Sequence, residues 1–191
     1  KKFEEACNPT LFTFSLSGEP TLYPKLGGMI KEIRKRKAVS FLVTNGQNPD
    51  VIEKLEKEKS LPTQLTVSCN AGNEELFKIW HRSLRKDSWE RFNKTLEIVK
   101  NLKGKTRRVI RLTLVKGKIS NMKNKDVDDY VNLIKIAEPD FIHVKGFMSV
   151  GWARERLGYE TMPWHYEVRD FASQLVKKLE GYKILGEEER S

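Results

Sequence analysis

Three short loops in the sequence carry side chains suited to holding a polar ligand. The first, residues 17–24 (SGEPTLYP), combines a carboxylate at Glu19 with Gly18, which permits a positive φ or a close approach of the backbone to a ligand. A carboxylate and free carbonyl groups together suit an ammonium group. The second and third loops, residues 44–46 (TNG) and 68–71 (SCNA), add hydroxyl and amide groups. The second loop also fits an ordinary tight turn, and each loop taken singly is weak evidence for a ligand site.

The elements around these loops alternate between strand and helix. Apolar periodicity predicts strands over 10–17, 39–44, 64–70, 107–116 and 140–146, separated or followed by helices over 24–37, 49–58, 88–102, 126–137 and 163–180. Residues 182–185 are expected to add a short edge strand. Such alternation favours an α/β fold with a parallel sheet and right-handed crossovers. Ligands of these folds bind at the carboxyl ends of the strands, where all three loops would lie.

Two of the helices carry N-cap signals, and two others begin at a proline, Pro24 and Pro163. Asn48 is predicted to cap the helix that begins at Pro49. Asp87 and Glu90 have the spacing of a capping box for helix 88–102.

Alternation within the strands predicts a polar cavity. Each strand pairs an apolar face with a polar one, and the polar sets are Thr13, Ser15 and Ser17; Ser40 and Thr44; Thr66, Ser68 and Asn70; Arg111 and Thr113; His143 and Lys145, with Leu42 breaking the rule. A closed eight-stranded barrel would have an apolar centre. An incomplete (β/α) barrel with a wet cavity for a nucleotide-like ligand fits better. The alternative, solvent faces of antiparallel strands, is disfavoured by the intervening helices.

The charge balance points to an anionic partner. Among 191 residues there are 36 Lys and Arg against 26 Asp and Glu, a net charge of +10. Nucleic acid is the first partner to consider and an anionic membrane surface the second. On charge alone, a lysine-rich solvated surface explains the balance equally well.

The sequence has neither a membrane anchor nor a cysteine framework. No apolar run approaches the roughly 20 residues of a membrane helix, and residues 1–5 lack a signal-peptide core. Two distant cysteines make neither a disulfide scaffold nor a metal site. We therefore expect a single domain over residues 1–191, no membrane partner and a reducing, cytoplasmic compartment.

Six segments in order resemble a known family. They are residues 16–24 (LSGEPTLYP), 41–46 (FLVTNG), 61–65 (LPTQL), 111–116 (RLTLVK), 140–146 (DFIHVKG) and 162–168 (MPWHYEV). A strand ending in Gly-Glu-Pro is typical of the radical S-adenosylmethionine (SAM) superfamily. Together the segments, spread over residues 6–189, resemble the tRNA 4-demethylwyosine synthases. Six matches are much more specific than the Gly-Glu-Pro motif alone.

The resemblance implies a fold and a reaction. The fold would be an incomplete six-unit radical SAM barrel. Family members cleave SAM reductively at a [4Fe–4S] cluster and join pyruvate carbons to N1-methylguanosine beside the anticodon of tRNA(Phe). The product is 4-demethylwyosine, and a second [4Fe–4S] cluster is thought to bind pyruvate. A separate electron donor and a monomeric protein are expected.

The resemblance also implies site residues. Cofactor binding would fall on Ser17, Gly18, Glu19, Thr44, Asn45, Ser68, Asn70 and Arg111. The first three would meet the methionine amino group, and Arg111 would neutralise a carboxylate. His143 and Lys145 are weaker candidates for acid–base or substrate contacts.

Basic and aromatic residues supply candidates for the tRNA side. Contacts are predicted at His81, Arg82, Lys116, Lys118, Arg154, Arg156 and His165. Trp80, Trp152 and Trp164 are candidates for stacking on an unstacked base. Trp80 fits a core position equally well, and His165 fits a structural role better than a catalytic one. The basic run 34–37 ends a helix, where positive charge favours the helix dipole.

The sequence departs from the family at the cluster. The superfamily's Cys-x3-Cys-x2-Cys motif, expected upstream of Cys7 after a first strand, is not in these residues, so no metal ligands are predicted in this chain. Cys69 is expected to be a small core residue and Cys7 a partly buried thiol. The chain alone is expected to be inactive. Two alternatives remain: a cluster-free tRNA-binding module on the same scaffold, or a radical SAM enzyme with a small-molecule substrate.

Overall fold

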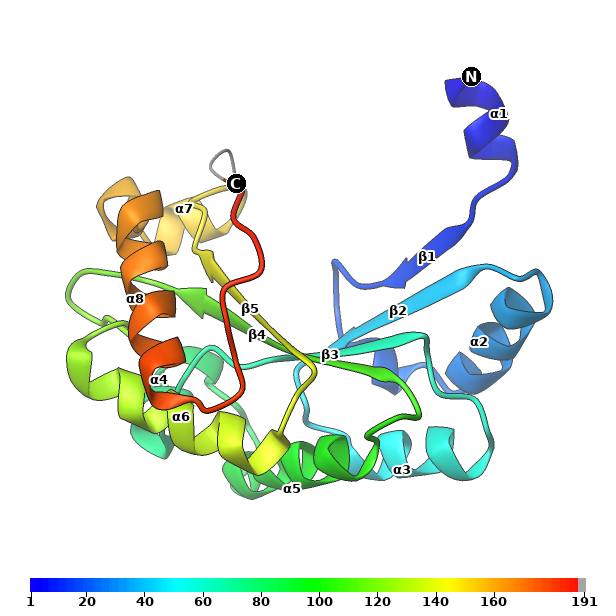
Figure 1. The fold of residues 1–191 in the computed structure, drawn as a ribbon, viewed down its shortest axis with the longest axis horizontal. Helices are drawn as coiled ribbons and strands as arrows, with labels where there is room; N and C mark the ends of the chain where they lie inside the picture. The colour runs from blue at the N-terminus through cyan, green and yellow to red at the C-terminus, as the bar shows by residue number, and fades with distance from the viewer. Residues whose placement is uncertain (189–191) are drawn as a thin grey trace.

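The sheet contains five parallel strands in chain order. The computed structural model describes residues 1–188, and Figure 1 shows the sheet with its helices. The strands are β1 (Leu11–Phe14), β2 (Val39–Thr44), β3 (Gln64–Ser68), β4 (Arg107–Leu114) and β5 (Phe141–Gly146), each paired in parallel with its neighbours along the chain. The predicted parallel sheet is confirmed, with each strand shorter than expected except β2.

Helices cover one face of this sheet. They are α2 (Leu26–Lys35), α3 (Pro49–Lys57), α5 (Ser88–Asn101), α6 (Asn124–Ala137) and α8 (His165–Lys178). Figure 1 shows them along the outer side of the curved sheet. We call the opposite side of the sheet the inner face. This arrangement confirms the α/β fold with outer helices.

The core lies between the strands and these helices. Leu42, Leu65, Val67, Ile110 and Leu112 are at most 1% exposed and belong to one cluster with apolar residues of the helices. Because side chains alternate along a strand, their sequence neighbours point to the inner face. The strand register therefore aligns the polar residues of β3, β4 and β5 on that inner face, as the alternation predicted.

The prediction for β2 was wrong. Leu42 and Thr44 are the register partners of the core-facing Leu65 and Val67 of β3, and Ser40 shares their helix side by alternation, so Phe41 and Val43 face inward. Both hydroxyl groups are buried but have partners. Ser40 Oγ accepts from Thr63 N–H at 3.2 Å, and Thr44 bonds to the loop after β1. These bonds satisfy polar groups that would otherwise disfavour the helix side.

Several short elements differ from the prediction. Those not predicted are α1 (Lys2–Cys7), α4 (Glu74–His81), α7 (Ala153–Arg156) and the 3-10 turns η1 (Pro20–Leu22) and η2 (Tyr159–Thr161). Asn73 Oδ1 accepts from Leu76 N–H at 3.0 Å and caps α4. Residues 182–185 are not a strand, because they make no ladder with β5. Tyr182 instead donates from its hydroxyl to Pro139 O at 2.6 Å.

Both predicted N-cap positions are confirmed, but neither side chain makes a capping hydrogen bond. Asn48 precedes α3 as expected, but its side-chain amide donates to Thr21 Oγ1 at 2.8 Å and does not cap the helix. Asp87 makes no capping bond and approaches Arg91 at 3.8 Å. Each predicted cap residue therefore contacts another side chain, Thr21 or Arg91, in place of the backbone N–H groups of its helix.

The two cysteines have different environments. Cys69 is buried, and burial raises the pKa of its thiol to about 12, which confirms it as a small core residue. Cys7 is exposed on α1, so its predicted partial burial was wrong. Within residues 1–188, no helix is long and apolar enough to cross a membrane.

Candidate functional site

Glu19 ties the loop after β1 to the end of β2. Its Oε1 accepts hydrogen bonds from Thr21 N–H (3.2 Å) and from the hydroxyls of Thr21 and Thr44 (2.7 Å each). Its Oε2 accepts from Asn45 N–H at 2.8 Å. Four donors thus occupy the carboxylate, which makes Glu19 a positioning residue. Ser17 and Gly18, the latter with φ +78°, remain exposed beside it.

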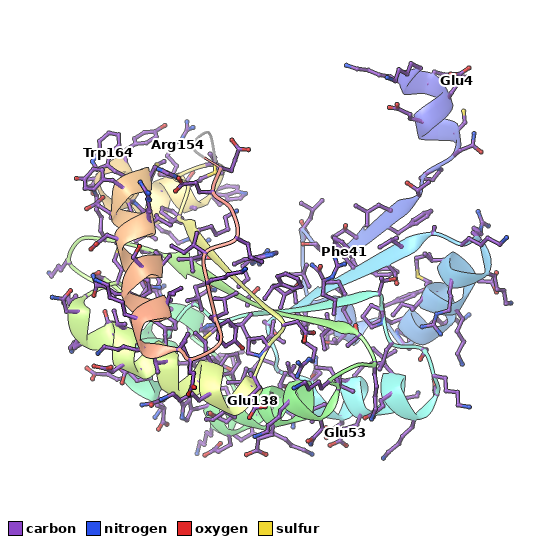
Figure 2. All side chains as sticks on the ribbon, viewed as in Figure 1. Glu4, Phe41, Glu53, Glu138, Arg154 and Trp164 are labelled. Atoms are coloured by element: carbon purple, nitrogen blue, oxygen red, sulfur yellow. The ribbon has the colours of Figure 1, made fainter. Side chains whose placement is uncertain are left out.

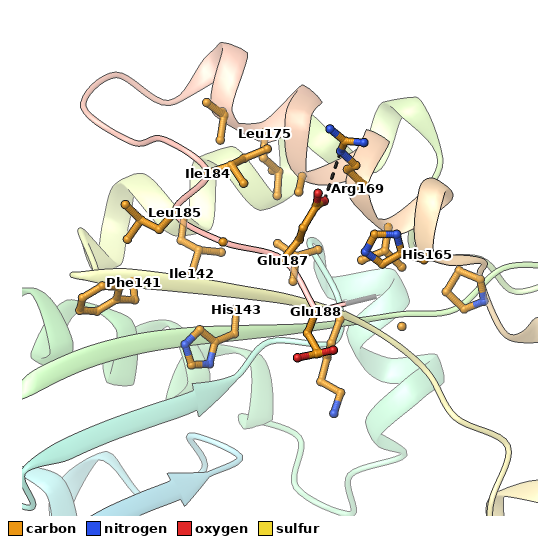
Figure 3. A pocket seen from close by; sticks show the side chains of 18 of the residues that line it. Phe141, Ile142, His143, His165, Arg169, Leu175, Ile184, Leu185, Glu187 and Glu188 are labelled. Carbon is orange, nitrogen blue, oxygen red and sulfur yellow. Dashed lines mark ion pairs between the residues drawn. The ribbon is translucent and has the colours of Figure 1, made fainter. Parts of the chain in front are cut away.

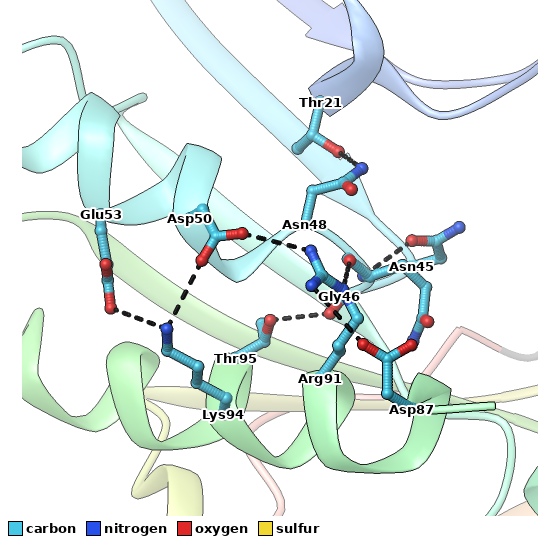
Figure 4. A network of polar contacts seen from close by, with 11 residues as sticks. Thr21, Asn45, Gly46, Asn48, Asp50, Glu53, Asp87, Arg91, Lys94 and Thr95 are labelled. Atoms are coloured by element: carbon cyan, nitrogen blue, oxygen red, sulfur yellow. Dashed lines mark hydrogen bonds and ion pairs between the residues drawn. The ribbon is translucent and has the colours of Figure 1, made fainter. Parts of the chain in front are cut away.

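The turn after β2 is fixed by helix α5, as Figure 4 shows. Thr95 Oγ1 donates to Gly46 O at 2.7 Å, and Arg91 Nε donates to Gln47 O at 2.7 Å. Gly46 has φ +75°, and a Cβ there would lie 3.0 Å from the ring of Phe92. Only glycine fits this close approach of the turn to the helix. Asn45 is therefore held in one position at the carboxyl end of β2.

Ser68, Arg111 and His143 form one row across β3, β4 and β5. Each is the register partner of the next, so their side chains share the inner face. Arg111 Nη2 donates to Ser68 Oγ at 2.7 Å, while Arg111 Nε is buried with no partner among the described residues. Thr113 and Lys145 form the next row toward the carboxyl ends. The inner face thus presents a guanidinium that is only partly satisfied.

Burial lowers the pKa values of two side chains in this row. It lowers the pKa of Arg111, and burial together with the charge of Arg111 lowers the pKa of His143. At neutral pH His143 is therefore an uncharged imidazole that can accept a proton.

Asn121 is a site residue that sequence reasoning missed. It is fully buried, donates from Nδ2 to Asn70 O (2.7 Å) and Thr113 O (2.9 Å), and accepts from Val115 N–H (2.7 Å). It thereby joins the loop after β3 to the end of β4. Asn70 Oδ1 is buried and has no partner within residues 1–188. An asparagine inside a basic loop carries no periodic signal, so Asn121 could not be found from local sequence patterns.

The predicted tRNA-contact residues have varied surroundings. His81 stacks on Phe77 with ring centroids 4.0 Å apart, and Trp80 packs against the core, which favours structural roles for both. Arg82 ends α4 in a left-handed conformation. His165 begins α8 and is half-buried.

The four remaining candidates lie beyond β4 and β5. Lys118, Arg154 and Arg156 are exposed in the segments that follow these strands. Lys116 is engaged by Glu167 at 2.7 Å.

A cavity of about 530 Å³ lies along β5, beside the inner-face row (Figure 3). Its walls are β5, α8 and residues 182–188, and Arg169 pairs with Glu187 across it at 3.3 Å. His143 and Lys145 line it, but Ile142, Val144 and Leu175 give it an apolar character. Its lining is mostly apolar with charged residues at one side, whereas the row at Arg111 is polar.

Two family models match the chain. The model for the radical SAM superfamily matches residues 1–122, and the model for wyosine base formation matches residues 136–191. The chain belongs to the radical SAM superfamily. This membership implies SAM and a [4Fe–4S] cluster.

Curated relatives match all 191 residues. The S-adenosyl-L-methionine-dependent tRNA 4-demethylwyosine synthase of Pyrococcus horikoshii is 46% identical, and that of Methanocaldococcus jannaschii is 39% identical. The chain covers 54% and 57% of these proteins, so it spans little more than half their length. The predicted resemblance to 4-demethylwyosine synthases is thereby confirmed.

Solved structures agree with these relatives. A structure of TYW1 with a lysine–pyruvate adduct bound matches all of this chain and 57% of its own, at 36% identity and a TM-score of 0.81. A domain of a pyruvate-formate lyase-activating enzyme from Bacteroides vulgatus, 13% identical with a TM-score of 0.66, shares the fold alone.

The described residues fit SAM but do not fit a [4Fe–4S] cluster. Asn70 Oδ1 and Arg111 Nε are an acceptor and a donor without partners, as a ligand with amino, hydroxyl and carboxylate groups requires. SAM has these groups. For the cluster, residues 1–188 contain no group of three potential ligands, and Cys7 and Cys69 lie in unrelated environments.

Proposed function

We propose that this chain is the SAM-binding core of a tRNA 4-demethylwyosine synthase. The full-length protein would convert N1-methylguanosine beside the anticodon of tRNA(Phe) into 4-demethylwyosine, with pyruvate and SAM as co-substrates. The observation that carries this proposal is the 46% identity over all 191 residues to a protein of that activity. Residues 1–191 would form a single radical SAM core domain.

Residues on the inner face would bind and orient SAM. The exposed backbone at Ser17 and Gly18, held by Glu19, would receive the methionine amino group, and Thr44 and Asn45 fix that loop. Asn70 Oδ1 would accept from a hydroxyl or amino group. Arg111, fixed by Ser68, would neutralise a carboxylate of SAM or pyruvate. When bound at its cluster, SAM supplies one-electron radical chemistry.

His143 and Lys145 would serve the substrate side of this site. Neutral His143 lies beside Arg111 in register and is able to accept a proton, while Lys145 stands one row nearer the strand ends. We assign them to acid–base catalysis or to contacts with pyruvate and the tRNA nucleobase.

Exposed cations beyond β4 and β5 would contact the tRNA. Lys118, Arg154 and Arg156 are exposed in the segments that follow these strands, at the end where the site lies. Lys116, His81, Arg82 and His165 are further candidates.

We also propose a second [4Fe–4S] cluster, a separate electron donor and a monomeric state for the full-length protein.

The test uses the full-length protein, reconstituted anaerobically with iron and sulfide. With reductant, SAM, pyruvate and N1-methylguanosine-containing tRNA, mass spectrometry should detect 5′-deoxyadenosine and the modified base. Formation of 5′-deoxyadenosine without modification of the tRNA base would indicate a radical SAM enzyme with another substrate. Failure to assemble a cluster would favour a tRNA-binding module.

A further inference from the structure

Trp164 is held on the surface by a compact polar unit. The indole is 66% exposed at the start of α8. Glu167 Oε2 accepts from the backbone N–H of Trp164 at 2.6 Å and from Lys116 Nζ at 2.7 Å. Lys116 Nζ lies 5.5 Å from the centroid of the Trp164 ring, within the range of a cation–π contact. Two segments about 50 residues apart in sequence therefore converge on one exposed indole.

Further contacts keep this unit in place. Lys116 N–H donates to Thr161 O at 3.0 Å, which joins the loop after β4 to the segment before α8. Burial raises the pKa of Glu167, but the bonds from Lys116 and Trp164 N–H outweigh this and lower it overall. The carboxylate thus stays charged at neutral pH. An ordered aromatic ring facing solvent loses little conformational freedom when a ligand stacks on it.

The surroundings of Trp164 suit single-stranded nucleic acid. Figure 2 shows Trp164 and Arg154 at the same end of the molecule. The guanidinium of Arg154 lies 5.6 Å from the centroid of the exposed Tyr159 ring, which forms a second aromatic–cation pair. Exposed rings with adjacent cations bind unpaired bases by stacking and the adjoining phosphates by charge. The net charge of +10 favours such a ligand over a protein partner of ordinary charge.

We propose that Trp164 is a stacking platform for an unpaired base of the tRNA, with Lys116 and Glu167 as its positioning residues. This inference rests on the proposed function and deepens it. It changes the role of Lys116, which the sequence suggested as a phosphate contact, because its ammonium group is already engaged by Glu167. The open face of the indole is the recognition element.

The test compares two RNA ligands on the full-length protein. Dissociation constants are measured for the substrate tRNA and for a fully paired RNA duplex of equal charge. Trp164→Ala should weaken tRNA binding about fivefold to 150-fold, the range for loss of one stacked base, and change duplex binding less than about twofold. Trp164→Phe should restore most of the affinity, because it keeps a π-face.

Matched variants separate stacking from general effects. Phe3→Ala removes an aromatic ring that is 79% exposed on α1, at the other end of the molecule from α8 (Figure 1), so tRNA affinity should be unchanged. Glu167→Gln should weaken tRNA binding and leave duplex binding intact, because it loosens the platform.

Three results would decide against the platform. Equal losses on both ligands for Trp164→Ala, no loss on tRNA, or no rescue by Trp164→Phe would each overturn the inference. Absence of base modification by the wild-type protein would instead reject the proposed function, and the binding comparison would still decide the role of Trp164.

Discussion

At the residue scale, Glu19 illustrates how a motif carboxylate acts through its loop. Sequence reasoning places it against the ligand, yet four hydrogen-bond donors from Thr21, Thr44 and Asn45 surround it. A carboxylate has room for about four such bonds, so its capacity is used internally. Its contribution to a ligand would be the fixed backbone of Ser17 and Gly18.

Glu19→Gln should weaken SAM binding in the full-length protein. The amide nitrogen cannot accept from Asn45 N–H or from the threonine hydroxyls, and a lost bond to a charged acceptor costs about 1.5–3 kcal/mol. We expect roughly a tenfold or greater increase in the dissociation constant for SAM, measured by calorimetry. Asn70→Ala should also weaken it, whereas Glu97→Gln, an exposed carboxylate on α5, should not. Unchanged affinity in both site variants would refute the assignment.

His143 should titrate below its ordinary pKa. Burial and the adjacent charge of Arg111 both lower it, so Arg111→Met should raise it toward about 6.5, as followed by NMR titration. Because the folded-state pKa lies below the unfolded one, the unfolded chain binds more protons, and His143 reduces stability as the pH falls below about 6.5. Arg111→Met should lessen that loss. A titration unaffected by Arg111→Met would show that the two side chains are not coupled.

At the element scale, an ion pair with a buried guanidinium and a partly solvated carboxylate joins β4 to the start of β5 and to α5, at the amino ends of the strands. Arg108 is 2% exposed and bonds to Asp140 through Nε and Nη2 at 3.2 and 2.7 Å. Its Nη1 donates to the carbonyls of Val99 and Lys100 near the end of α5. This single side chain therefore fixes the strand pair against the helix layer, on the side of the sheet away from the candidate site.

Arg108→Ala should destabilise the protein by about 2–4 kcal/mol. This is less than the roughly 3–5 kcal/mol for a fully buried pair, because Asp140 is partly solvated. Urea unfolding measures the change. Arg107→Ala is the matched control: its guanidinium is exposed and lies over the ring of Phe141, so a loss within about 1 kcal/mol is expected. Similar losses for the two variants would contradict this account.

The turn after β2 offers a second element-scale test. Gly46→Ala places a methyl group 3.0 Å from Phe92 in a left-handed conformation, and a loss of about 1–3 kcal/mol is expected from unfolding curves. Gly104→Ala has nearly the same φ, +77°, with nothing within 4 Å of the added Cβ. This variant should lose only the stability that corresponds to placing an alanine in a left-handed conformation, about 1 kcal/mol. Equal effects would mean that packing against α5 does not select glycine.

At the scale of the whole molecule, the charge of +10 should give steeply salt-dependent tRNA binding. Lys118→Ala and Arg156→Ala should each lower the slope of log affinity against log salt by about 0.7–0.9 if the residue contacts a phosphate. Lys57→Ala, at the end of α3, should leave the slope unchanged. Affinity that does not depend on salt would exclude a phosphate-contacting surface.

Sequence patterns alone were enough to predict the order of strands and helices, the parallel sheet and the polar inner faces of β3, β4 and β5. Local periodicity is sufficient there, because one face of each strand is consistently apolar. It failed in β2, where Ser40 and Thr44 face the helices and are satisfied by partners elsewhere in the chain. It also missed α4, which falls between two expected elements.

Which polar groups act together is set by tertiary packing. The alignment of Ser68, Arg111 and His143 depends on the register of three strands, and the role of Asn121 depends on loops 51 residues apart in sequence. The Lys116–Glu167–Trp164 unit likewise joins segments from opposite sides of β5 in the chain. Periodicity reports which face a residue occupies, whereas partners across strands and loops are set by packing, which no local pattern encodes.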